Sequence, residues 1–304
     1  MKALPSFRKF PKRSLSIGIF GLIFASVGVA LLVSSSALTP TASFETEQGI
    51  LASPAATVTD ASASGGSAVK FNAASSPSGE AMPVGNLPGF TQILAQDFNT
   101  TATSTAFTAT YANSWCPYDD GGQYYRSQVS GHDGIMDITL DGTKGAAGVF
   151  GPPGKCWSNL YGRFSMRMRV LGGADNGTAV MLWPTSDKWT DGEIDYPEAS
   201  NFTDTIHVYH HPTPCDDNDT VPPPHCGSFD GLDTGARWNV WHTFAIEWTP
   251  ASVKYYLDNA LIKTVTHDIP TTNHRYTIQV APTGSSPQPG NMQIDWVTMY
   301  SYNP

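Results

Sequence analysis

The stretch Trp183 to Glu198, WPTSDKWTDGEIDYPE, decides the predicted fold and function of this chain. It holds three carboxylates, Glu193, Asp195 and Glu198, within six residues that otherwise resemble a β-strand. Side chains two residues apart in a strand point to the same face, so Glu193 and Asp195 share a face. Glu198, five residues after Glu193, would point to the opposite face of a regular strand. Pro197 predicts a β-bulge, and the extra bulged residue returns Glu198 to the face of the other two.

The predicted geometry suits chemistry at a glycosidic bond. With the bulge, Glu193 and Glu198 are four strand steps apart, about 13 Å at about 3.3 Å per residue. Two glutamates that lean toward each other can bring their carboxyls to about 5 Å, the spacing of a retaining glycosidase, whereas an inverting enzyme needs about 6.5–9.5 Å. Three carboxylates this close cannot all ionise at their ordinary pKa values, so at least one keeps its proton near neutral pH. A glycosidase needs this asymmetry, with one ionised nucleophile and one protonated acid.

An isolated E-x-D-x-x-E is most often a solvated surface face, and the surrounding sequence decides between the two interpretations. EIDYPE resembles the bulged E-[hydrophobic]-D-x-x-E signature of glycoside hydrolase family 16, typical of laminarinases, agarases and carrageenases. Four further segments resemble family motifs: YGRF (161–164), GTAVMLWP (177–184), WHTFAIEWTPASVKYYLDNALIKTV (241–265) and MQIDWV (292–297). The likeness covers residues 90–302 approximately, far more than a single motif.

The resemblance implies an all-β fold, a β-jelly-roll sandwich of the concanavalin A-like lectin and glucanase type, with the triplet in its concave cleft. It assigns Glu193 as the nucleophile, Asp195 as its hydrogen-bonded assistant and Glu198 as the general acid/base. Two positions depart from the family pattern. Ser165 stands where many members have glutamate, and Gln279 stands at an asparagine position. We expect Gln279 to bind substrate, and both departures bear on substrate preference more than on catalysis.

Aromatic residues are the other substrate-binding candidates, because flat apolar rings match the C–H faces of pyranose rings. Trp189 immediately precedes the catalytic strand, and its family counterpart lies in the cleft. Trp183 fits the cleft or the core equally well. Trp115 flanks a cysteine in a predicted cleft-side loop, where packing against a disulfide is the alternative role. The family also places a histidine near the acid/base from the next strand; we predict His210, although the register does not decide between it and His211.

Composition divides the 304 residues into three parts. Residues 1–37 combine a basic start, an apolar run over residues 17–33 and a small-residue cleavage site, which predicts a signal peptide or an N-terminal membrane anchor. Residues 38–85 are rich in Ala, Ser, Thr and Pro and predict a disordered linker. Residues 86–304 form the predicted catalytic domain. We therefore expect a secreted protein, with anchoring through residues 15–37 as the alternative.

Charge narrows the choice of partner. The chain has 17 Lys and Arg against 26 Asp and Glu, a net charge of −9. The first 37 residues hold five of the basic residues and none of the acidic ones, so the exported part is more acidic still. An acidic surface argues against nucleic acid and against a polyanionic polysaccharide as partners, and it favours a neutral β-glucan.

The chain has four cysteines, which in an exported protein permit two disulfides in three pairings. We favour Cys215–Cys226, which closes a polar, Pro-rich loop, and this choice leaves Cys116–Cys156. A zinc site with neighbouring histidines is the alternative, but the C-x₁₀-C spacing is not that of a zinc knuckle. We therefore expect no catalytic metal and no required cofactor. Many relatives carry a structural calcium on the convex side, and Asp295 matches one position of that site.

The leading hypothesis is a retaining endo-glycosidase that hydrolyses a neutral β-glucan, expected to contain β-1,3 linkages. A transglycosylase would use the same site but resolve the intermediate with a sugar hydroxyl in place of water. A non-catalytic, lectin-like glycan-binding module is disfavoured, because such a module does not need all three carboxylates.

Overall fold

The computed structural model describes residues 55–59, 62–71, 76–154, 156, 158–216 and 224–304, which separate into two units at Asn72 and Ala73. The predicted signal peptide or anchor lies outside the described residues. Among the residues described, no helix is long and apolar enough to cross a membrane. In the first unit, β1 (Ala55–Thr59) pairs antiparallel with β2 (Ser67–Phe71) across a short 3₁₀ turn, η2 (Ser64–Gly66). This hairpin lies inside the predicted disordered linker and differs from that prediction.

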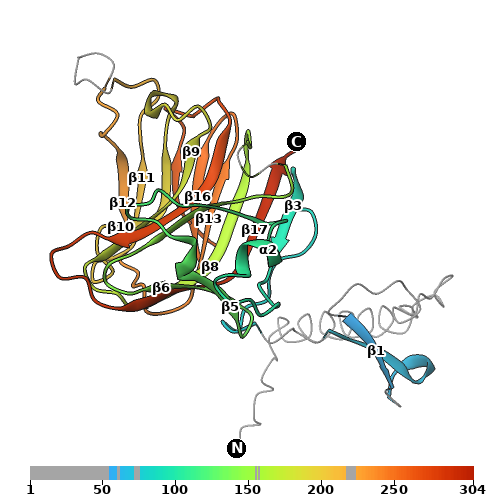
Figure 1. Cartoon of the computed structure of the whole chain (residues 1–304). Helices are drawn as coiled ribbons and strands as arrows, with labels where there is room; N and C mark the ends of the chain where they lie inside the picture. Colours follow the sequence, from blue (N-terminus) through green and yellow to red (C-terminus); the bar gives the residue numbers. More distant parts are fainter. Residues whose placement is uncertain (1–54, 60–61, 72–75, 155, 157, 217–223) are drawn as a thin grey trace, which may run out of the picture. The chain divides into compact units, whose positions relative to one another are not determined.

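The second unit is built from two antiparallel sheets, which confirms the predicted all-β, jelly-roll sandwich (Figure 1). The seven-stranded sheet has the order β12-β11-β10-β9-β16-β7-β4. Its strands are β4 (Trp115–Tyr118), β7 (Ala146–Phe150), β9 (Asn176–Pro184), β10 (Ile194–Ala199), β11 (His207–His210), β12 (Asp230–Asp233) and β16 (His274–Pro282).

The eight-stranded sheet has the order β15-β14-β13-β8-β17-β6-β5, with β3 also paired to β17. Its strands are β3 (Phe90–Gln96), β5 (Val129–His132), β6 (Ile135–Leu140), β8 (Gly162–Gly172), β13 (His242–Trp248), β14 (Val253–Leu257), β15 (Ala260–Val265) and β17 (Gly290–Tyr302). The short helical elements in this unit are α2 (Phe107–Thr110), η3 (Arg126–Gln128) and η4 (Trp189–Asp191).

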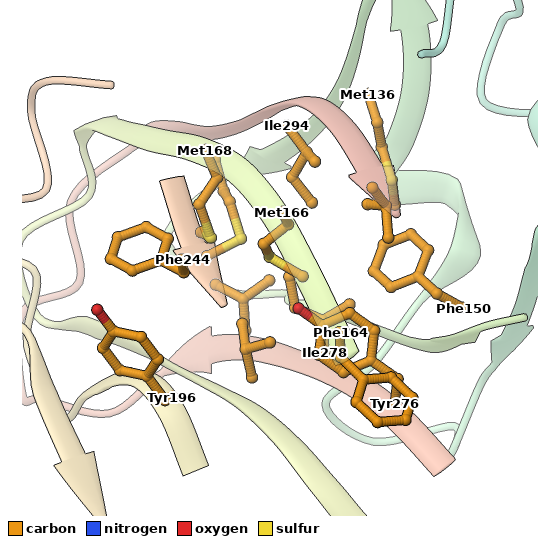
Figure 2. Packing of buried hydrophobic residues seen from close by; sticks show 14 of the residues in the cluster. Met136, Phe150, Phe164, Met166, Met168, Tyr196, Phe244, Tyr276, Ile278 and Ile294 are labelled. Carbon is orange, nitrogen blue, oxygen red and sulfur yellow. The ribbon is translucent and has the colours of Figure 1, made fainter. Parts of the chain in front are cut away.

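The hydrophobic core lies between the two sheets, and Figure 2 shows side chains from both meeting there. Tyr276 and Ile278 of β16 face Phe164 and Met166 of β8, and all four are fully buried. Because side chains alternate along a strand, the residues between these core positions point to the opposite face of each sheet. The outer face of the seven-stranded sheet is thereby free to carry polar side chains.

The folded unit begins earlier than the predicted boundary at residue 86. Arg167, almost fully buried on the outer face of the eight-stranded sheet, forms an ion pair of 2.7 Å with Glu80. The backbone N–H of Ser78 donates to the carboxylate of Asp295, which is also buried. Buried charges require partners, and these two find theirs in a segment whose Ser- and Gly-rich composition resembles a linker.

Both predicted disulfides are confirmed. Cys116 and Cys156 are joined with an S–S distance of 2.01 Å, and Cys215 and Cys226 with one of 2.07 Å. All four sulfurs are therefore engaged, which leaves no thiolate for the alternative zinc site.

Candidate active site

The carboxylate triplet lies on β10 and the residue just before it, in the interior of the seven-stranded sheet. Asp195 pairs with Met181 of β9 and Glu198 with Ala179, so three steps along β10 match two along β9. The same register shift occurs against β11. This confirms the predicted bulge. It places Glu198 on the outer face of the sheet with Glu193, while Ile194 and Tyr196 between them point into the core.

Burial and mutual proximity perturb all three carboxyls. Desolvation first, and the charge of Asp195 second, raise the pKa of Glu193 to about 9. Desolvation and the charge of Glu198 raise the pKa of Asp195 well above its ordinary value. The pKa of Glu198 rises to about 7, again through desolvation first and through the charge of Glu193 second. Glu193 and Asp195 are in contact and titrate together, so the triplet retains protons at neutral pH.

His211, not His210, joins the triplet. The Nε2 atom of His211 lies 3.1 Å from Oδ2 of Asp195, and its Nδ1 lies 2.9 Å from the carbonyl oxygen of Cys226. A carbonyl oxygen only accepts, so Nδ1 of His211 carries a proton and donates it. The Nε2 atom of the neutral ring then has no proton of its own, and it faces the Asp195 carboxyl. The raised pKa of Asp195, caused by burial first and by the charge of Glu198 second, favours its protonated form.

The prediction of His210 as a cleft residue was wrong. His210 pairs with Ile194 and, like it, points to the core side, where it is 1% exposed. The hydroxyl of Tyr255 lies 2.8 Å from its Nδ1, and its Nε2 lies 3.0 Å from the carbonyl oxygen of Asp268. Burial lowers the pKa of His210 to about 4. The alternation Ile206, Val208, His210 already assigns His210 to the apolar face, and this is the signal that could have decided the register.

The prediction of Trp115 as a substrate-binding residue was also wrong. Its side chain is 1% exposed and belongs to the hydrophobic core. The ring lies 4.9 Å from that of Phe150, and a Cβ added at Gly148 would stand only 2.4 Å from the indole. Trp115 therefore anchors β4 against β7, and the absence of a side chain at Gly148 makes room for it.

The remaining candidates lie at the site. A pocket of about 150 Å³ is lined by Glu193 together with Met181, Trp183, Arg275, Thr277 and Gln279. A second pocket of about 180 Å³ adjoins Glu198 and is also lined by Gln279 and Tyr124. Trp189, partly exposed, has its ring centre 5.7 Å from that of His211. The structure thus brings Trp183, Trp189 and Gln279 to the triplet.

Two tyrosines at the cleft were missed by the sequence analysis. Gln279 donates through Nε2 to the hydroxyl of Tyr118 at 2.7 Å, and the hydroxyl of Tyr124 donates to Oε1 of Gln279 at 3.3 Å. The loop that carries Tyr124 is held by Asp120, which accepts three consecutive backbone N–H groups. The predicted disulfide at Cys116, two residues before Tyr118, was the feature of the sequence that could have indicated an ordered segment beside the cleft.

The site also contains a group of side chains with the chemistry of metal ligands. Within the part of the chain that the structure describes, the group able to hold a metal is Glu193, Asp195 and His211, whose ligand atoms lie within 4.8 Å of one another. Asp295 does not fit a calcium site. Its Oδ2 accepts hydrogen bonds from both Ser76 and Ser78, and the guanidinium of Arg167 donates to the same Ser78 hydroxyl. Donors and a neighbouring cation occupy the position where calcium would require free oxygen ligands.

Comparison with known proteins agrees with this geometry. The sequence profile of the family described as "Glycosyl hydrolases family 16" matches residues 124–298. A "Beta-glucanase" from Rhodothermus marinus is 29% identical over 107 residues, which are 33% of this chain and 36% of that protein. The match thus spans about a third of the length of this curated relative.

Solved structures show the same fold. The catalytic domain of an endo-1,3-β-glucanase (laminarinase) from Thermotoga petrophila RKU-1 has a TM-score of 0.56 at 18% identity, covering 72% of this chain and 100% of that one. The laminarinase from Rhodothermus marinus has a TM-score of 0.56 at 20% identity, with the same two coverages.

Proposed function

Because the chain belongs to glycosyl hydrolase family 16, we propose that it is a retaining endo-glycosidase that hydrolyses a neutral β-glucan containing β-1,3 linkages. The observation that carries the proposal is the bulge in β10. It aligns Glu193, Asp195 and Glu198 on one face of the sheet, next to two pockets. The names of the relatives from Rhodothermus marinus and Thermotoga petrophila, a β-glucanase and an endo-1,3-β-glucanase, support the choice of substrate class.

In the first step, the protonated carboxyl of Glu198 gives its proton to the glycosidic oxygen while a carboxylate oxygen of Glu193 attacks the anomeric carbon. The C–O bond to the leaving sugar breaks, and a glycosyl ester forms on Glu193. A pKa of about 7 suits Glu198 to this role, because it is protonated yet acidic at neutral pH. For Glu193 to attack as a carboxylate, the proton held between it and Asp195 must reside on Asp195, whose Oδ2 atom lies 3.1 Å from Nε2 of His211.

In the second step, the Glu198 carboxylate removes a proton from a water molecule, whose oxygen attacks the anomeric carbon and breaks the ester to Glu193. Two displacements at the same carbon retain its configuration. Glu198 recovers its proton and Glu193 its charge, so the site returns to its starting state with no cofactor.

We further propose that the protein is exported and works without a structural calcium. Two disulfides support export, since such bonds persist in oxidising compartments. The Arg167 guanidinium beside Asp295 supports the absence of calcium, because it supplies the positive charge there. Addition of a chelator should therefore leave the melting temperature unchanged, and a marked fall would overturn this point.

The deciding experiment is reducing-end release from laminarin, mixed-linkage glucan, xyloglucan and agarose, with wild type and Glu193→Gln side by side. We expect release from laminarin and a loss of at least about 10³-fold in the variant. Asp204→Asn, which removes an exposed carboxyl that follows β10 and lines neither pocket, is the matched control and should keep full activity. Near wild-type activity in Glu193→Gln would refute the assignment, and product analysis at high acceptor concentration separates hydrolysis from transglycosylation.

A further inference from the structure

A continuous row of rings borders the catalytic triplet on the side of β11 and β12. Neighbouring ring centres in it are 5.7 Å, 6.1 Å, 4.7 Å and 5.8 Å apart. In order along the row, the rings belong to Trp189, His211, Phe229, Tyr209 and His207. Tyr209 and His207 stand on β11 opposite Asp195 and Glu198, and Phe229 lies farther from the triplet than either. The two pockets lie on the other side of β10, over β9 and β16, so the ring row and the pockets flank the triplet from opposite sides.

Tyr209 is close to the catalytic carboxyls. It pairs with Asp195 across β10 and β11, and side chains paired in this way share a face of the sheet. The pKa of Tyr209 is raised, by burial first and by the charge of Glu198 second, as expected for a phenol near that carboxyl. Any sugar that leaves the triplet in this direction therefore reaches Tyr209 first.

Phe229 extends the row onto the rim, where it is 56% exposed. Its position is fixed by the strand beneath it. A Cβ added at Gly231 would stand 3.0 Å from the Phe229 ring, so any larger residue would push the ring from its place over β12. The ring also packs edge-on against Tyr209, with an interplanar angle of 83°. The Phe229 ring is therefore both exposed to solvent and held in a defined orientation, as a ligand-binding ring must be.

We propose that Tyr209 and Phe229 form a platform that binds glucosyl rings of the substrate chain beyond the scissile bond, over β11 and β12. The platform is continuous with the triplet and its rings are apolar, and such rings match the C–H faces of pyranoses. The side chains of His207, which pairs with Glu198, and of Asp233 on β12 lie 3.9 Å apart and supply polar atoms for sugar hydroxyls. This inference rests on the proposed function, because it assigns extra sugar positions to the same cleft.

Affinity for oligosaccharides of different length tests the platform. We would measure binding of laminaribiose and laminarihexaose by calorimetry in the Glu193→Gln background, which does not consume the ligand. Phe229→Ala should weaken laminarihexaose binding about tenfold and leave laminaribiose binding almost unchanged, because only the longer ligand reaches the rim. Gly231→Ala should act in the same direction by displacing the ring. Tyr209→Phe, which keeps the ring, should bind nearly as the parent does.

Leu261→Ala is the matched control, since Leu261 is 53% exposed but lies on β15 of the other sheet. Equal hexaose affinity in Phe229→Ala and Leu261→Ala would overturn the platform. If Phe229→Ala weakens laminarihexaose binding but the wild type hydrolyses no glucan, the proposed function is overturned and the platform stands. If the wild type hydrolyses glucan but Phe229→Ala binds laminarihexaose as the parent does, the platform is overturned and the proposed function stands. Failure of hydrolysis and of binding to both oligosaccharides would overturn both.

Discussion

Replacement of Glu198 by glutamine should stabilise the protein, and increasingly so as the pH rises. The pKa of Glu198 is about 7 in the folded state against 4.5 for the free side chain, chiefly because burial disfavours the charged form. Between these values the unfolded chain releases the proton and the folded protein keeps it, so stability falls as pH rises through this window and levels off above about 7. Each pKa unit corresponds to about 1.4 kcal/mol, so the wild type loses about 3 kcal/mol between pH 4.5 and pH 8 through this group.

Glutamine carries no charge at any of these pH values and does not suffer this loss. Denaturant unfolding of wild type and Glu198→Gln at pH 4.5 and pH 8 measures the effect. The difference in free energy of unfolding should shift by about 3 kcal/mol in favour of the variant, which is about 6–12 °C in melting temperature for a domain of this size. Asp204→Asn, which removes an exposed carboxyl, is the matched control. A difference that is independent of pH, or that moves in favour of the wild type, would refute the burial argument.

Two further predictions concern the site's protons. The kcat/KM of the wild type should fall as pH rises through about 7, because Glu198 must be protonated to release the leaving sugar. A kcat/KM that stays constant up to pH 9 would contradict the role of Glu198 as the general acid. His211→Gln should lower kcat about 100-fold, because it removes the ring nitrogen that faces the protonated Asp195 carboxyl. His210→Gln should leave kcat nearly unchanged but lower the free energy of unfolding by about 1–3 kcal/mol, because its buried partners lose their hydrogen bonds. If instead kcat fell in His210→Gln and not in His211→Gln, the roles of the two histidines would have been misassigned.

Local periodicity explains what the sequence predicted correctly. The alternation in EIDYPE and the proline within it were sufficient to predict both the shared face of the carboxyls and the bulge, since each depends on neighbouring residues alone. The same rule, applied to Ile206, Val208 and His210, would have assigned His211 to the cleft.

Other features depend on contacts between residues far apart in the chain. Trp115 is buried because Gly148, over thirty residues away, leaves a space for the indole. The segment at Ser78 is ordered because Asp295 and Arg167, on two neighbouring strands that are far from Ser78 in sequence, need partners. Neither glycine content nor a Ser-rich composition reveals such a partner, and so both the role of Trp115 and the start of the folded unit were predicted wrongly.

The burial that makes the carboxyls reactive also lowers the free energy of unfolding, and apolar side chains of β10 offset this cost. Glu193 and Asp195 alternate with Ile194 and Tyr196, whose side chains are fully buried in the core. Full burial of an aliphatic or aromatic side chain contributes about 1.5–3 kcal/mol, similar in size to the cost of desolvating a carboxyl whose pKa rises by about two units. Because the strand must hold the charged face in place to keep the core face packed, the acid and the nucleophile are fixed before substrate arrives. A substitution at Ile194 should therefore impair catalysis through geometry while leaving every catalytic side chain present.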